Sequence, residues 1–117
     1  MNSDNRRRSP RVNQEKFLRV TVMDPVKAGI KKATVQLLSQ DLSMHGIRFR
    51  TYDFLPLTTA IRVDLKLEHI SAPVAIPGVV RRVRELPNFR MYEVGAEFHS
   101  LSPEVLALLT EFVDRHA

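Results

Sequence analysis

The chain has 117 residues, a length that suits one domain with one hydrophobic core. It is 44% hydrophobic and 26% charged, as globular proteins are, and its lack of cysteine excludes disulfides, thiolate metal sites and cysteine nucleophiles. The formal net charge is +5, and the first twelve residues, with four arginines and one aspartate, carry +3 of it. Such a concentration of positive charge indicates an anionic partner: a nucleotide, a nucleic acid or an acidic surface.

No apolar run approaches the ~20 residues of a membrane helix. The polar, basic start of the chain has no apolar run behind it, so neither a secretory signal nor membrane insertion is expected. Together with the absence of cysteine, this predicts a cytoplasmic protein.

In chain order, residues 1–14 are polar, charged and without periodicity, which predicts a flexible basic arm ahead of a single domain, 15–117. Apolar and polar residues then alternate with period two, which predicts β-strands separated by turn residues. The predicted strands are 17–23, 34–40, 47–51, 61–67, 79–84 and 90–98. A bulge or bend is expected near Gly78, and Leu86-Pro87-Asn88 is expected to join the last two strands.

The last element is predicted to be a helix over about 103–116. Ser102 suits the N-cap, Pro103 the first helical position, and Glu104 complements the helix dipole. Its apolar residues recur at helical spacing and are expected to dock on the protein's own sheet rather than on a partner. Six strands and one helix predict a mainly β protein, an antiparallel barrel or two-layer sheet.

The segment Asp41-Leu42-Ser43-Met44-His45-Gly46 is predicted to be a turn between two strands. Asp41 and Ser43 are two residues apart, so in extended backbone their side chains leave on one face and form a small polar site. Gly46 permits a positive φ or the close approach of a ligand to the backbone. The same residue types also form ordinary Asx or Ser turns, so a purely structural role is open at this point.

Arginines cluster near the start of the chain in Arg6-Arg7-Arg8-Ser9-Pro10-Arg11. Arg7 and Arg11 have the spacing i, i+4, which places them on one side of a strand or of a helix, so they can act together in either conformation. Taken alone, the cluster is equally compatible with a solubilising basic tail.

With both motifs, RxxxR and then DxSxxG, the chain resembles the PilZ domain family, which binds the bacterial second messenger cyclic di-GMP. The resemblance extends over most of the chain. Ile47-Arg48-Phe49, Gly78-Val79-Val80-Arg81 and residues 92–98 follow in the family's order. It implies a six-stranded antiparallel barrel with a C-terminal helix, in agreement with the strand count.

The resemblance also implies roles for the arm. Arg7 and Arg11 would contact phosphate and guanine, because guanidinium groups bond phosphate oxygens in pairs and stack on bases. Arg8 is a further candidate contact. The arm is expected to be free without ligand and to wrap across the barrel when the nucleotide binds.

On the barrel, the resemblance implies that Asp41 and Ser43 bond a guanine edge or a phosphate. Gly46 would permit close approach, and Arg48, on the polar face of the next strand, is another candidate. His45 lies inside the motif and either borders the ligand or is a solvated turn residue.

We therefore expect a cytoplasmic cyclic di-GMP receptor with no cofactor, no metal and no catalytic activity, which signals to a downstream protein partner. One alternative is a small basic barrel that binds single-stranded nucleic acid; the strand aromatics are predicted to face inward, which argues against it. Another is a PilZ-like adaptor that binds protein only, against which the presence of both motifs argues. No catalytic constellation or Gly-rich phosphate loop is evident.

Overall fold

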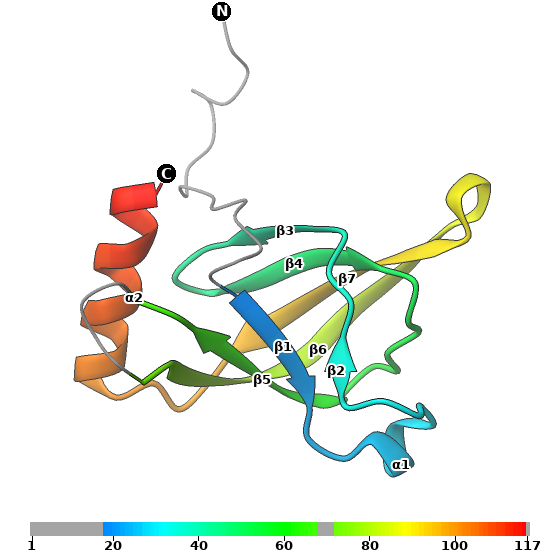
Figure 1. Cartoon of the computed structure of the whole chain (residues 1–117), viewed down its shortest axis with the longest axis horizontal. Helices are drawn as coiled ribbons and strands as arrows, with labels where there is room; N and C mark the ends of the chain where they lie inside the picture. Colours follow the sequence, from blue (N-terminus) through cyan, green and yellow to red (C-terminus); the bar gives the residue numbers. More distant parts are fainter. Residues whose placement is uncertain (1–17, 68–71, 117) are drawn as a thin grey trace, which may run out of the picture.

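The computed structural model describes residues 18–67 and 72–116, so the predicted arm 1–14 lies outside the described residues. Seven strands form one antiparallel sheet in the order β2-β1-β5-β6-β7-β4-β3, with helix α2 at one end (Figure 1). The elements are β1 (Leu18–Val22), α1 (Pro25–Ala28), β2 (Thr34–Val35), β3 (Ser39–Leu42), β4 (Gly46–Thr51), β5 (Ala60–Leu65), β6 (Val74–Leu86), η3 (Pro87–Phe89), β7 (Met91–Phe98) and α2 (Pro103–His116).

The prediction of a mainly β, antiparallel fold with a C-terminal helix is confirmed, but the predicted strand 34–40 is two strands. β2 pairs with β1, whereas β3 pairs with β4. Between them the alternation changes phase: Val35 and Leu37 are buried, and then Gln40 and Leu42. Residues 36–38 therefore connect β2 and β3, which are the first and last strands in the sheet order.

β6 is longer than predicted because it pairs on both sides in turn. Residues 74–79 pair with β5, and residues 78–86 pair with β7. The predicted bulge near Gly78 lies instead at Arg81, the extra residue between Val80 and Arg82 in the register with β7. Gly78 marks a close approach of strands, since a Cβ there would lie 3.1 Å from the carbonyl oxygen of Glu97. The predicted connection after Leu86 is confirmed as η3.

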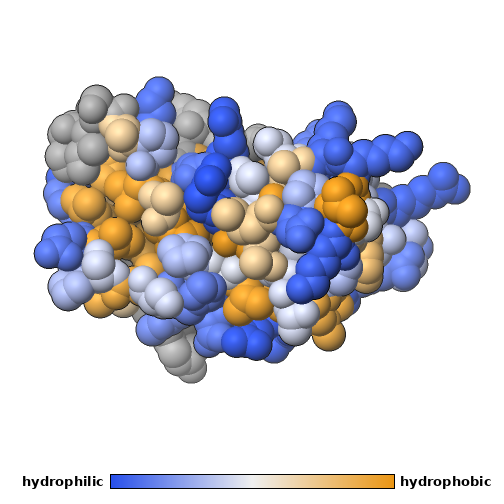
Figure 2. All heavy atoms as spheres, turned by 90° about the horizontal axis from the view of Figure 1, so that it is seen from below, coloured by the Kyte–Doolittle hydropathy of each residue, from blue (hydrophilic) through white to orange (hydrophobic). Residues whose placement is uncertain are grey.

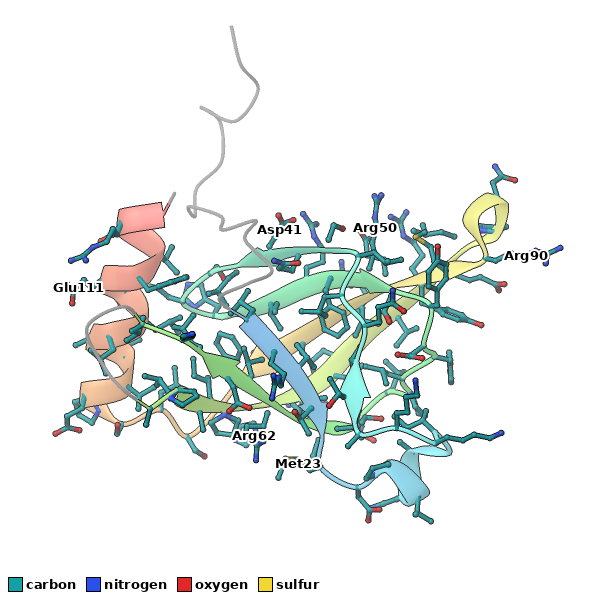
Figure 3. The ribbon with its side chains drawn as sticks, viewed as in Figure 1. Met23, Asp41, Arg50, Arg62, Arg90 and Glu111 are labelled. Carbon is teal, nitrogen blue, oxygen red and sulfur yellow. The ribbon has the colours of Figure 1, made fainter. Side chains whose placement is uncertain are left out.

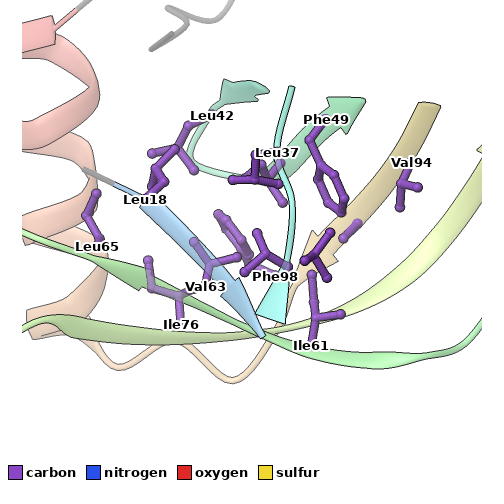
Figure 4. Close-up of a cluster of buried hydrophobic side chains, with 14 of the residues drawn as sticks. Leu18, Leu37, Leu42, Phe49, Ile61, Val63, Leu65, Ile76, Val94 and Phe98 are labelled. Carbon is purple, nitrogen blue, oxygen red and sulfur yellow. The ribbon is translucent and has the colours of Figure 1, made fainter. Parts of the chain in front are cut away.

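The hydrophobic core lies inside the curved sheet and is closed at one end by α2 (Figure 4). Alternating strand residues such as Ile61, Val63 and Leu65 are almost fully buried, as predicted. The Ser102 hydroxyl accepts a hydrogen bond from the backbone N–H of Val105 at 3.1 Å, which caps α2. The buried helix residues belong to the same core cluster, so the predicted docking of the helix on its own sheet is confirmed; they are Leu109, Phe112 and Val113.

Candidate ligand-binding groove

A groove of 460 Å³ lies on the outer face of the sheet, where β3, β4, β7 and β6 lie side by side. This volume is in the range of small-molecule sites. The charged lining residues are three arginines and three acids: Arg48, Arg81, Arg82, Asp41, Glu93 and Glu97. The groove's own side chains are therefore balanced in charge.

Strand register explains why the groove forms at this place. Asp41, Arg48, Gly95 and Arg82 form one row across the four strands. Residues opposite one another on neighbouring strands have side chains on the same face, about 5 Å apart. Gly95 contributes no side chain to this row, so it leaves a hollow between Arg48 and Arg82 that forms the groove floor.

Ion pairs hold most of the charged side chains in place. An Arg48 guanidinium nitrogen lies 2.9 Å from a carboxylate oxygen of Asp41, its cross-strand neighbour. Arg81 lies 3.2 Å from Glu97. Arg82 makes neither an ion pair nor a side-chain hydrogen bond with any other residue in 18–67 and 72–116. Among the lining arginines, Arg82 is thus the one without an ion-pair partner in these ranges.

Glu93 forms ion pairs with arginines on both strands beside β7. Its carboxylate lies 2.6 Å from Arg84 on β6 and 3.7 Å from Arg50 on β4. Burial by itself would raise the pKa of Glu93, but the hydrogen bond and charge of Arg84, with the charges of Arg48 and Arg50, outweigh it. The pKa of Glu93 is therefore lowered, and the side chain is a carboxylate at neutral pH.

Asp41 and Ser43, which the sequence predicts to share one face, both line the groove. Asp41 is the third residue of β3, and Ser43 begins the turn to β4. The Ser43 hydroxyl accepts a hydrogen bond from the His45 N–H at 3.2 Å and donates one to the Gly46 carbonyl at 3.4 Å. Ser43 therefore also forms the Ser turn that the sequence left open, and exposed His45 borders the groove.

Of the two roles that the sequence left open for Gly46, a positive φ or the close approach of a ligand, the first is not the one found. Gly46 is the first residue of β4, and among the glycines of the described chain Gly29 has the positive φ. A Cβ at Gly46 would overlap the backbone carbonyl oxygen of Ala96. The glycine is thus required because β7 passes directly against the end of the turn.

Sequence reasoning placed Arg48 in the site, and the structure brings it beside Asp41. It missed Arg82, Glu93 and Gly95, because their place in the groove depends on strand register and on the bulge at Arg81. The pattern of β7 alone marks Glu93 as facing outward but does not say which strands lie beside it. The candidates Arg7, Arg8 and Arg11 lie outside the described residues.

Fold and groove together define a small antiparallel β-barrel whose outer wall carries a groove bordered by charged residues. The chain belongs to the PilZ domain family, whose profile matches residues 5–115. The match includes both the arginine-rich start and the DxSxxG turn. No curated protein matches the chain.

Among solved structures, the chain is similar to the Bacillus subtilis inhibitor of motility (MotI/DgrA), with a TM-score of 0.61 and 18% sequence identity. The alignment covers 94% of this chain and 50% of that one, so the chain spans about half the length of that protein. At this identity the likeness shows the fold alone.

Two further observations concern residues 18–67 and 72–116. No three or more His, Cys, Asp or Glu side chains come together there in a way that could hold a metal ion. Neither of the α-helices in these ranges has the length and apolar character needed to cross a membrane.

Proposed function

We propose that this chain is a receptor for cyclic di-GMP, which binds in the groove beneath the arginines of the N-terminal arm. The observation that carries the proposal is the groove, because Asp41 and Ser43 of the DxSxxG motif both line it. The chain belongs to the PilZ family and also contains the RxxxR motif. The messenger's two phosphates and two guanines require cations and an acidic acceptor. This chain has both.

The N-terminal arm is needed in the proposal because the charged side chains that line the groove have no excess of positive charge. The lining arginines equal the lining acids in number, and Arg48 and Arg81 are already ion-paired. A ligand with two negative charges needs additional cations. Unpaired Arg82 supplies one, and Arg7 and Arg11 supply the others from the arm, by bidentate bonds to phosphate and by stacking on guanine.

Asp41 is suited to the guanine edge that carries N–H donors. Arg48 holds the carboxylate from the neighbouring strand, so its orientation is fixed before the ligand arrives. Ser43, whose hydroxyl is oriented by the turn, contributes a second polar group on the same side. In this proposal the ligand lies between the fixed Asp41 carboxylate on the barrel and the arginines of the arm, and it is not enclosed in a cavity.

Binding then orders the arm. Fixing about eight residues costs on the order of 10 kcal/mol of backbone entropy. Four or five charge-assisted hydrogen bonds of ~1.5–3 kcal/mol each offset that cost, and stacking supplies the net affinity. The ordered arm changes the surface of the cytoplasmic receptor, and a partner protein reads this change.

Isothermal titration calorimetry with cyclic di-GMP, GTP and a short single-stranded oligonucleotide tests the proposal. Saturable heat is expected with cyclic di-GMP only. Arg11→Ala and Asp41→Ala should each weaken binding roughly tenfold or more, since each removes charge-assisted bonds. The matched controls are Arg19→Ala and Asp114→Ala, at exposed positions away from the groove. Unchanged affinity in both site variants would contradict the proposed site.

The two alternatives give different results in the same titration. A single-stranded nucleic-acid binder would respond to the oligonucleotide, but the described groove lining contains no phenylalanine, tyrosine or tryptophan, the large rings on which successive bases stack. The exposed aromatics Tyr52 and Phe54 do not line this groove. An adaptor that binds only protein would give no heat with any of the three.

A further inference from the structure

A second surface is formed by two connections that lie side by side, residues 23–32 after β1 and residues 52–58 after β4. Each connection is also tied to the strand region that flanks the other: the Met23 N–H donates to the carbonyl of Ala60, the first residue of β5, at 3.0 Å, and the Asp53 carboxylate accepts from the N–H of Gln36, which follows β2, at 3.4 Å. Two hollows, of 240 and 440 Å³, are each lined by residues from both connections. We call residues 23–32 and 52–58 together the α1 surface.

Large hydrophobic side chains are exposed on the α1 surface. The described chain exposes six such residues, and five of them lie here: Met23, Val26, Tyr52, Phe54 and Leu57. Val26 on α1 is 88% exposed. Figure 2, which views the molecule from the side on which α1 lies, shows hydrophobic atoms interspersed with hydrophilic ones. Apolar side chains gathered in this way mark interaction sites, whereas single exposed ones do not.

A strained turn presents one of these side chains. Thr58 has φ of 68°, which is rare for a β-branched residue. The strain is held by the Thr58 N–H, which donates to the Val80 carbonyl at 2.8 Å, and by the Thr59 hydroxyl, which donates to the Pro56 carbonyl at 2.6 Å. Leu57, beside Thr58, is 59% exposed. Backbone strain of this kind is often found in functional segments. Here it lies next to Leu57, which is not among the core residues.

The charges around these side chains are unequal. Lys27, Lys31 and Lys32 are exposed. The two carboxylates of the surface are engaged with backbone N–H groups: Asp24 accepts from Lys27 at 3.1 Å, and Asp53 accepts from Gln36. The α1 surface therefore combines exposed apolar side chains with three exposed ammonium groups on the 23–32 connection, one more than the carboxylates of the surface.

We infer that the α1 surface is the docking site for an acidic, amphipathic segment of a partner protein. Its carboxylates would pair with the lysines, and its apolar side chains would fill the two hollows. A lipid surface has no side chains to fill such hollows, and a second copy of the chain would bring the same lysines face to face. The inference rests on the proposed function only in that a receptor must have a partner; the surface stands apart from the groove, sharing no lining residue with it.

The probe is a synthetic peptide in which leucine and phenylalanine alternate with aspartate and glutamate, titrated into 15N-labelled protein. Saturable shifts are expected for the backbone N–H signals of the non-proline residues in 23–32 and 52–58. A peptide with lysine in place of every acid should leave these amides unchanged. Binding to phosphatidylglycerol vesicles instead, self-association through these residues, or no saturable shift with the acidic peptide would each overturn the inference.

Variants with matched controls separate docking from unspecific attraction. Lys31→Glu and Val26→Ser should each weaken binding of the acidic peptide by roughly tenfold. Lys66→Glu makes the same charge change, and Leu106→Ser likewise replaces an aliphatic side chain with serine, at exposed positions outside the α1 surface; both should leave binding unchanged. Equal losses in site and control variants would overturn the inference.

Calorimetry with cyclic di-GMP on the same four variants separates this inference from the proposed function. Nucleotide affinity is expected to remain at the wild-type value in Lys31→Glu and Val26→Ser. If these two variants lose nucleotide affinity together with peptide affinity, the α1 surface is not a separate site. If the wild-type chain binds the acidic peptide but not cyclic di-GMP, the receptor proposal fails and the docking surface stands.

Discussion

Glu93 is the acidic side chain around which the arginines of the outer face are arranged. It lies between Arg50 and Arg84 in one cross-strand row, and its pKa is lowered by their charge. Without this carboxylate, neighbouring guanidinium groups would repel one another across the sheet. Glu93 thus makes an arginine-rich wall compatible with a stable sheet.

This arrangement predicts acid sensitivity. A lowered pKa means that charged Glu93 stabilises the fold above the ordinary glutamate pKa of 4.5, and that this stabilisation is lost as the pH falls through the lower folded-state value. Glu93→Gln should reduce the free energy of unfolding by about 1 kcal/mol at pH 7 and flatten its dependence on pH below about 5. Thermal unfolding across pH 3–7 measures both effects.

The matched control is Glu85→Gln, the same change at an exposed position of the β6–β7 hairpin. Glu85 makes no ion pair or side-chain hydrogen bond with other residues in 18–67 and 72–116. Its variant should keep the wild-type pH dependence. A Glu93→Gln chain that unfolds with the wild-type pH dependence would contradict the assignment.

Strand β7 crosses the groove between β4 and β6, and two glycines set how closely its neighbours approach. Gly46 on β4 has no room for a Cβ, because the Ala96 carbonyl occupies that space. Gly95 on β7 has room, since a Cβ there would lie 3.6 Å from the Cβ of Arg82, an ordinary contact. The first glycine is needed by the fold, whereas the second leaves the groove open.

The two glycines should therefore respond differently to the same substitution. Gly46→Ala is expected to destabilise the protein by more than about 2 kcal/mol, through overlap with β7. Gly95→Ala should leave stability within about 1 kcal/mol of wild type but place a methyl group on the groove floor and weaken cyclic di-GMP binding. Urea unfolding and calorimetry distinguish them; a stable Gly46→Ala chain would show that close strand approach is not why glycine is needed.

The sequence predicted the elements well where burial alternates without interruption, as in Ile61 to Leu67 and in Tyr92 to Phe98. It failed at the run 34–40, where the chain bends at Leu38 and changes its pairing partner from β1 to β4, so that one predicted strand is two. Of the residues that line the groove, the sequence predicted Asp41, Ser43, Gly46 and Arg48 as candidates. The groove residues of β6 and β7 could not be predicted, because residues far apart in sequence become neighbours only through register.

At the scale of the whole molecule, the groove and the α1 surface lie on different sides of the barrel. Figure 3 shows Asp41 and Arg50 along one side of the sheet and Met23 on the opposite side, near α1. Both surfaces are built on one rigid core. The proposed nucleotide and the proposed partner would therefore not compete for the same residues.

Ordering of the arm is a prediction about the whole chain. Backbone 15N relaxation should show residues 1–14 becoming rigid when cyclic di-GMP is added, because their arginines then bind the phosphates. Relaxation of the core strands should remain unchanged and serves as the internal reference. An arm that is equally rigid before the ligand is added would contradict the ordering mechanism.

Phe54 of the α1 surface packs against the ring of Tyr92, edge to face, with 5.3 Å between ring centroids. The next residue of β7, Glu93, lines the groove. The barrel wall at this point is a single strand thick, and one peptide unit separates the residue that supports the proposed docking surface from the residue that borders the proposed nucleotide site. A structural change at the proposed nucleotide site would therefore need to pass through only one peptide unit to reach the residue that supports the proposed docking surface.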